Sequence, residues 1–187
     1  MSQPFDKYKT KGAYHWDWYD DPNYAWYKEC VDRIVDFCKG STIDVGCGDG
    51  LVMQKIKENG YFVHGYENDD TAIKILYEKG LRLSWVDLDE VDDFGGWMGE
   101  PFEYMACLNT IEHLKTPEVL IKIVEDATKG AIIITDKATE HKGRYHEHEY
   151  TKEELLETFA EFKPKYFEIN STEFGKPITF IGVEIRK

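Results

Sequence analysis

The chain has 187 residues, of which 42% are hydrophobic and 14% aromatic, and this composition argues against a disordered protein. Its formal net charge is −13, from 36 acidic and 23 basic residues, so DNA or RNA would be repelled and a nucleic-acid partner is disfavoured. No apolar run approaches the roughly 20 residues that cross a bilayer, which argues against membrane association.

The N-terminus and the cysteines indicate a cellular compartment. The first residues carry no apolar segment that could serve as a secretory signal. The four cysteines show neither CxxC spacing nor a disulfide framework, so we interpret them as buried apolar residues in a reducing environment. We therefore expect a cytoplasmic protein.

Strand-like and helical stretches alternate along the chain. After an aromatic N-terminal segment, apolar residues at a spacing near 3.6 predict a first helix at 24–39, which ends at Gly40. The predicted strands that follow are 41–45, 61–66, 81–86, 102–108 and 131–135. The further predicted helices are 51–59, 71–79, 117–128 and 152–162. The last of these helices should begin with a capping box formed by Thr151 and Glu154.

Two more predicted strands, 165–172 and 178–185, close the chain and are joined by a short turn around Gly175–Pro177. This last pair should be antiparallel. The preceding strand–helix units require a parallel sheet with helices on both faces, because parallel strands need crossover connections. The predicted fold class is therefore α/β, with a doubly wound, mostly parallel sheet that ends in an antiparallel C-terminal hairpin.

A glycine-rich turn follows the first predicted strand and offers the strongest functional signal. Gly46, Gly48 and Gly50 form a G-x-G-x-G pattern, where the backbone can turn sharply and a ligand can approach without a Cβ in the way. This spacing differs from the G-x-G-x-x-G of dinucleotide sites. Asp44 and Asp49 add carboxylates, which suit a ligand with a positive centre and disfavour a pyrophosphate.

Acidic residues also follow the second and third predicted strands. Glu67 lies about 20 residues beyond the glycine turn, where such a side chain can accept hydrogen bonds from ribose hydroxyls. After the third strand, Asp87 could accept a hydrogen bond from an adenine amino group while Leu88 packs on the ring. This order of acids along the chain indicates a nucleoside-containing cofactor.

Residues 43–113 resemble the core of the class I S-adenosylmethionine (SAM)-dependent methyltransferases, and most closely the quinone-biosynthesis O-methyltransferases. The resemblance implies S-adenosyl-L-methionine as the cofactor. It also implies a single methyltransferase domain over 1–187, with an N-terminal lid segment and helix at 1–40 and a Rossmann-like core at 41–187. The residues expected to bind the cofactor are Asp44, Gly46, Cys47, Gly48, Asp49, Gly50, Glu67, Asn68, Asp87, Leu88 and Leu108.

Glu112 and His113 follow the fourth predicted strand, at the sheet edge where open α/β folds bind ligands. A histidine there could take a proton from a hydroxyl or amine as the methyl group moves. In the alternative, His113 packs against or caps the next helix while Glu112 faces water. The resembled subset commonly carries Glu-His here, and we predict catalytic roles for both residues.

The segment 143–151 carries alternating histidine and glutamate residues after the fifth predicted strand. If it is extended, His146 and His148 share a face and could contact an acceptor or ligate a divalent metal. The RNA 3′-terminal 2′-O-methyltransferases hold a metal with a Glu-x-x-Glu-His segment and a downstream histidine, but Asn109 stands at the first glutamate here. Because an amide is a poorer ligand for a hard cation, we predict no metal and assign both histidines to the acceptor.

The N-terminal segment Tyr14–Tyr19 is unusually aromatic. Its aromatic side chains could simply pack over the edge of the sheet and anchor the terminus. In the resembled family a segment at this place often covers the cofactor and shapes the acceptor pocket, and both interpretations can hold together. His15 and Trp16 are therefore predicted to contact the acceptor.

The predicted activity is methyl transfer from SAM to an oxygen or nitrogen of a small-molecule acceptor. The enzyme would mainly align donor and acceptor and exclude water, and no covalent intermediate on Cys47 is needed. Three alternatives stay open: a nucleotide-dependent oxidoreductase, a non-catalytic SAM-binding partner module, and a metal-assisted RNA 2′-O-methyltransferase. The sequence leaves the oligomeric state open.

Overall fold

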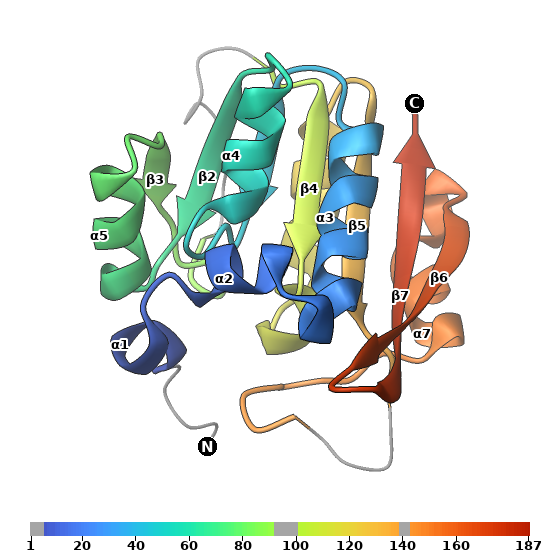
Figure 1. The fold of residues 1–187 in the computed structure, drawn as a ribbon. Helices are drawn as coiled ribbons and strands as arrows, with labels where there is room; N and C mark the ends of the chain where they lie inside the picture. Colours follow the sequence, from blue (N-terminus) through green and yellow to red (C-terminus); the bar gives the residue numbers. More distant parts are fainter. Residues whose placement is uncertain (1–5, 92–100, 139–142) are drawn as a thin grey trace.

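The computed structural model describes residues 6–91, 101–138 and 143–187, and a seven-stranded sheet runs through them (Figure 1). The strands lie in the order β3-β2-β1-β4-β5-β7-β6. β1 to β5 pair in parallel, whereas β7 is antiparallel to both of its neighbours, β5 and β6. This arrangement confirms the predicted fold class. The strand bounds are β1 Thr42–Val45, β2 Val63–Glu67, β3 Leu83–Trp85, β4 Tyr104–Leu108, β5 Gly130–Asp136, β6 Lys165–Glu173 and β7 Lys176–Arg186.

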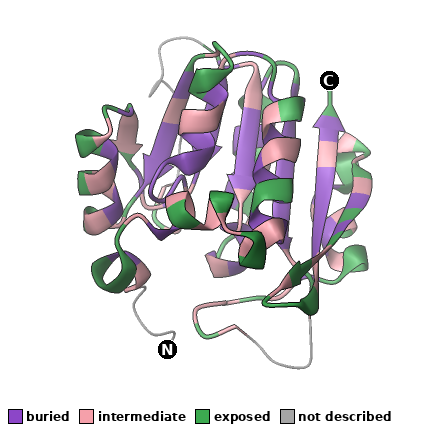
Figure 2. Ribbon diagram, viewed as in Figure 1, coloured by how far each residue is buried: buried purple, intermediate pink, exposed green. Residues whose placement is uncertain are grey.

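Helices cover both faces of the sheet. Their bounds are α1 Lys7–Lys11, α2 Tyr14–Asp20, α3 Ala25–Phe37, α4 Leu51–Glu58, α5 Asp70–Glu78, α6 Glu118–Asp126 and α7 Lys152–Thr158, with 3-10 turns η1 Pro22–Tyr24, η2 Ile111–His113 and η3 Ala160–Phe162. In β4, Met105 and Cys107 pack in the core under α6 and α7, while Ala106 packs in the core under α3 and α4. Successive side chains of a strand point to opposite faces, so the central strands are buried on both sides (Figure 2).

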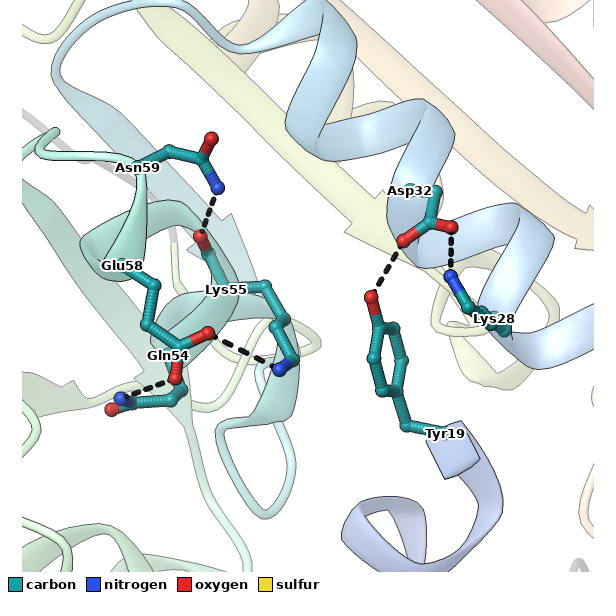
Figure 3. Close-up of polar contacts among 7 residues, drawn as sticks. All are labelled: Tyr19, Lys28, Asp32, Gln54, Lys55, Glu58 and Asn59. Atoms are coloured by element: carbon teal, nitrogen blue, oxygen red, sulfur yellow. Dashed lines mark hydrogen bonds and ion pairs between the residues drawn. The ribbon is translucent and has the colours of Figure 1, made fainter. Parts of the chain in front are cut away.

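The N-terminal segment forms two short helices, α1 and α2, which the sequence pattern did not reveal. They lie on the side of the molecule toward which the arrows of β2 and β4 point (Figure 1). Tyr19 of α2 donates a 2.7 Å hydrogen bond to Asp32 of α3, and Lys28 pairs with the other oxygen of the same carboxylate (Figure 3). The Lys55 ammonium of α4 lies 4.5 Å from the Tyr19 ring centroid. These contacts hold α2 against α3 and α4.

The C-terminal hairpin differs from the prediction in its turn. Phe174 and Gly175 are the two turn residues, with φ of +47° and +74°, as a two-residue turn between twisted antiparallel strands requires. Lys176 and Pro177, which we placed in the turn, pair with β6 as the first residues of β7. The Phe174 N–H donates to the carbonyl of Asn23, so the hairpin tip rests on η1.

The last predicted helix is shorter than expected. It ends at Thr158 and is followed by η3, although its predicted capping box between Thr151 and Glu154 is present. None of the helices within the described residues is both long enough and apolar enough to span a bilayer.

Candidate active site

A cavity of about 680 Å³ opens at the carboxyl ends of the parallel strands, beneath the N-terminal segment. This is the edge at which open α/β sheets bind ligands. The predicted site residues that line it are Asp44, Gly46, Cys47, Gly48, Glu67, Asn68, Asp87, Leu88, Leu108, Glu112, His113, His15 and His146. Four others, Asp49, Gly50, Trp16 and His148, are not part of its lining.

In the first loop, side chains of other elements pack against Gly48 and Gly50 where a Cβ would lie. Gly48 and Gly50 adopt φ of +56° and +82°, a region that side chains with a Cβ disfavour. A Cβ at Gly48 would overlap the Tyr8 hydroxyl of α1, and one at Gly50 would overlap the Leu76 side chain of α5. We had interpreted the glycines as clearance for a ligand, but at these two positions protein atoms lie in that space.

The backbone donors of the same loop are also engaged. The N–H groups that already donate to oxygens of the chain are those of Gly46, Cys47, Gly48 and Gly50. A pyrophosphate would need such donors, as well as surroundings that are not acidic. The loop therefore fits a cofactor without phosphate better than a dinucleotide.

Two buried carboxylates at the ends of β1 and β2 define one half of the cavity, the cofactor half. Asp44 is only 2% exposed, and its Oδ2 has no hydrogen-bond partner among the described residues. Burial, with the nearby charge of Glu67, raises the pKa of Asp44 to about 8. Glu67 accepts hydrogen bonds from the N–H groups of Gly48, Asn68 and Asp69, which fix its carboxylate, while burial raises its pKa. An unpaired carboxylate that faces a cavity fits a ligand with a positive group.

The end of β3 completes the cofactor half. The Asp87 carboxylate accepts the Asp89 N–H at 3.0 Å, which orients it, and the Leu88 side chain is buried beside it. Both residues line the cavity. This pair offers one polar and one apolar contact, which suits a heteroaromatic base. The cofactor half thus fits SAM in its donors, charge and apolar surface.

Cys47 lies in the loop and also lines the cavity. Burial raises the pKa of its thiol well above the usual range, so the nucleophilic thiolate is disfavoured. The structure therefore supports the view that this cysteine does not act as a nucleophile.

The other half of the cavity, the acceptor half, contains Glu112 and His113 of η2. Glu112 is 1% exposed and accepts a 2.9 Å hydrogen bond from the Thr135 hydroxyl, so the alternative in which it faces water is wrong. Burial raises the Glu112 pKa to about 7. His113 places its Nδ1 3.0 Å from the Tyr145 carbonyl oxygen, which makes Nδ1 the protonated nitrogen of the neutral ring. Burial lowers the His113 pKa, so the neutral ring is favoured.

The segment 143–150 brings only one of its two histidines to the cavity. The His146 ring lies 5.1 Å from the His113 ring, and its Nδ1 is 3.3 Å from Glu149 Oε1. The His148 side chain is 49% exposed and faces Glu154 at 3.5 Å, outside the cavity. The segment is not a strand, and so the expected sharing of a face by the two histidines does not occur.

Asp49 anchors the N-terminal segment above the loop. Its Oδ2 accepts the His15 N–H at 2.9 Å, and its carbonyl accepts the Trp16 indole N–H at 3.0 Å. His15 stacks on Tyr27 and lines the cavity. Trp16 lies outside the lining, with the Lys79 ammonium 3.5 Å from its ring centroid. Of the two predicted acceptor contacts in this segment, only His15 borders the cavity.

Several cavity residues were missed at the sequence level. Asp136 ends β5, and the rule that identified Glu67 as a strand-end acid could have found it, but the predicted strand stopped at Thr135. Asn109 has φ of +50° and a buried Oδ1 without a partner in the described parts of the chain, features that no sequence pattern signals. Lys7 lies on a helix too short to show periodicity.

Comparison with known proteins identifies the family. Residues 23–166 match a family described as a methyltransferase domain. The ubiquinone biosynthesis O-methyltransferase of Azoarcus sp. (strain BH72) is 26% identical over 111 residues, which are 56% of this chain and 47% of that protein. The protein of the same name from Thiobacillus denitrificans is 25% identical over 95 residues, 49% of this chain and 40% of that protein. The chain matches less than half the length of these relatives.

Solved structures share the fold at low sequence identity. Magnesium protoporphyrin IX methyltransferase from Synechocystis PCC 6803, with bound S-adenosylhomocysteine (SAH), superposes with a TM-score of 0.70 at 14% identity and 97% coverage of both chains. The 1,6-didemethyltoxoflavin-N1-methyltransferase of Burkholderia thailandensis gives 0.63 at 13% identity, covering 100% of this chain and 93% of that one. The predicted family and cofactor are confirmed. Because the family match extends over most of its length, the chain belongs to this family of methyltransferase domains.

Proposed function

We propose that this protein transfers a methyl group from SAM to an oxygen or nitrogen of a small-molecule acceptor. The observation that carries the proposal is the buried Asp44 carboxylate, which has an unpartnered Oδ2 among the described residues and borders a cavity that continues to His113. A cavity of about 680 Å³ suits a cofactor with a small acceptor. Two relatives carry names that specify O- and N1-methylation, which supports both acceptor atoms.

The chain's own residues divide the work between the two halves of the cavity. In the cofactor half, Asp44 would hold a positive group of the cofactor, Glu67 its ribose hydroxyls, and Asp87 with Leu88 its base. The Glu67 carboxylate is held in place by three backbone N–H groups, so little reorganisation is needed to bind. When bound, SAM supplies a sulfonium-activated methyl group.

In the acceptor half, a proton must leave the acceptor's O–H or N–H group as it is methylated. The neutral His113 ring already carries a proton on Nδ1. When no metal ion is bound, its Nε2 is therefore the nitrogen that can take the proton from the acceptor. Glu112 and His146 lie beside it and shape the charge around the acceptor. The N-terminal segment contributes Lys7, Tyr8, Tyr14 and His15 to the lining of the cavity and would help to exclude water from it.

Calorimetric titration with SAH tests the cofactor half directly. We expect the wild-type protein to bind one SAH per chain, and Asp44→Asn to bind more weakly because the carboxylate charge is gone while the shape is kept. NADH serves as the control ligand. Binding of NADH in preference to SAH would contradict the proposal and favour an oxidoreductase, and SAH binding without methyl transfer to any small acceptor would favour a non-catalytic module.

A further inference from the structure

Three side chains in the acceptor half have the spacing of metal ligands. Glu112, His113 and His146 each place one ligand atom within 4.8 Å of the others. Glu112 and His113 come from η2, whereas His146 comes from the segment after β5, and the two pieces are joined by hydrogen bonds from the N–H groups of Glu147 and His148 to the Glu112 carbonyl. The cluster is thus formed by tertiary structure, and two imidazoles with one carboxylate are a common donor set for divalent transition metals.

The hydrogen bonds around the cluster orient each of these groups as a ligand. His113 Nδ1 is 3.0 Å from the Tyr145 carbonyl oxygen, and His146 Nδ1 is 3.3 Å from Glu149 Oε1. These oxygen atoms accept, so both rings carry the proton on Nδ1 and an electron pair on Nε2. Histidines that ligate metals characteristically donate their other N–H to a carbonyl or carboxylate. Glu112 is oriented in the same way, because its Oε2 accepts from the Thr135 hydroxyl at 2.9 Å.

The charges around the cluster also favour a cation. Asp136 Oδ2 lies 3.8 Å from His146 Nε2, which adds a second carboxylate on the side of the ring that offers the electron pair. Lys7 lines the same cavity, and its single positive charge acts on both Glu112 and Asp136. A divalent ion would compensate the two carboxylates more fully than Lys7 does.

We propose that Glu112, His113 and His146 bind one divalent transition-metal ion at the acceptor end of the cavity, with Glu149 as the group that positions His146. This inference revises the prediction of no metal, which rested on the amide at Asn109. With the ion in place, His113 Nε2 is a ligand and no longer takes the proton; the ion would instead lower the pKa of an acceptor hydroxyl that coordinates to it, and the proton released would pass to solvent water. The site is independent of the cofactor half, so it does not depend on SAM being the methyl donor.

The test uses Co²⁺ as the probe and untagged, full-length protein that has been stripped with a chelator. Visible absorption and equilibrium dialysis with elemental analysis report the coordination and the stoichiometry. We expect one Co²⁺ per chain in the wild type and in His148→Ala, a matched control that removes a histidine of the same segment outside the cluster. Removal of an orienting group lowers metal affinity about 10–100-fold, so we expect about 10-fold for Glu149→Gln and at least about 100-fold for His146→Ala and Glu112→Gln.

The proposal is wrong if the wild type takes up no stoichiometric Co²⁺, or if His146→Ala binds Co²⁺ as tightly as His148→Ala does. Circular dichroism in chelator shows whether each variant is folded, and Glu149→Gln, which keeps all three ligands, remains informative if a ligand variant unfolds. Neither SAM nor an acceptor is present in the measurement. Failure of the metal site is therefore distinct from failure of SAH binding, which reports on the proposed function.

Discussion

The two halves of the cavity are built in different ways. The cofactor half is formed by strand ends that follow one another in the chain, and two of its carboxylates, those of Glu67 and Asp87, accept backbone hydrogen bonds. The acceptor half combines η2, the end of β5 and the segment 143–150, and its geometry depends on side-chain contacts such as Thr135 with Glu112. The proposed cofactor site thus depends mainly on local backbone geometry, whereas the proposed acceptor site depends on tertiary contacts. Variants in the cofactor half should therefore change the affinity for SAH, whereas variants in the acceptor half should change the turnover rate.

The largest effect is expected at His113. His113→Ala should lower the turnover rate by about 10²–10⁴-fold, the usual contribution of a group that handles a proton, while the affinity for SAM stays nearly unchanged. The measurement compares kcat, on an acceptor found by screening small hydroxylated and amine-bearing compounds, with SAH affinity by calorimetry. If His113 only packs, the variant will instead show a lower Tm and activity in proportion to the folded protein.

The pH profile of the wild type adds a second test of His113. Burial lowers the pKa of this histidine from its ordinary value, so the neutral ring persists below pH 6.5. Activity should be constant near neutrality and fall at more acidic pH as the ring becomes protonated and loses its Nε2 electron pair. An unchanged acid limb in His113→Ala would assign the titration to another group.

The corresponding variant in the cofactor half is Glu67→Ala. It should weaken SAH binding by about 1.5–3 kcal/mol, the usual effect of losing hydrogen bonds to a charged group. Glu58→Ala removes an exposed carboxylate from α4 and is the matched control. Calorimetry measures both, and equal SAH affinity in Glu67→Ala and wild type would remove Glu67 from the cofactor site.

A smaller effect, on stability, is expected at Asp44. Burial raises the Asp44 pKa to about 8, whereas an unfolded aspartate titrates near 3.9, so the folded chain holds an extra proton between these pH values. The free energy of unfolding of the cofactor-free protein should therefore fall as pH rises from about 4 to about 8.

Asp44→Asn should remove this loss. At pH 8, without cofactor, its free energy of unfolding should exceed that of the wild type by about 1–2 kcal/mol, or about 2–8 °C in Tm. The same variant should bind SAH less tightly. Thermal unfolding at pH 5 and pH 8 checks the prediction, and a difference in Tm that does not grow with pH would show that Asp44 is not the titrating group.

The contrast between the two halves also explains what could be predicted from the sequence. Local sequence patterns predict the alternation of strands and helices and the acids at the ends of β1, β2 and β3. These features, and the family that they indicate, could therefore be identified from the sequence. Asn109 was not found because the pattern of strands and helices carries no signal for its left-handed backbone, with φ of +50°. The convergence of His113 with His146, across 32 intervening residues that include β5, depends on the order of strands in the sheet.

The smallest effect is expected at His148, for which the sequence and the structure disagree. The sequence assigned it to the acceptor together with His146, but its side chain is 49% exposed and pairs with Glu154 at 3.5 Å on the surface. Such exposed pairs contribute about 0–1 kcal/mol, and its backbone N–H, which donates to the Glu112 carbonyl, is kept in His148→Ala. We therefore expect turnover, SAH affinity and Tm close to those of the wild type, whereas His146→Ala should lower turnover. Equal losses of turnover in the two variants would mean that the segment 143–150 rearranges to bring both histidines to the acceptor, and the boundary drawn here around the acceptor half would have to include His148.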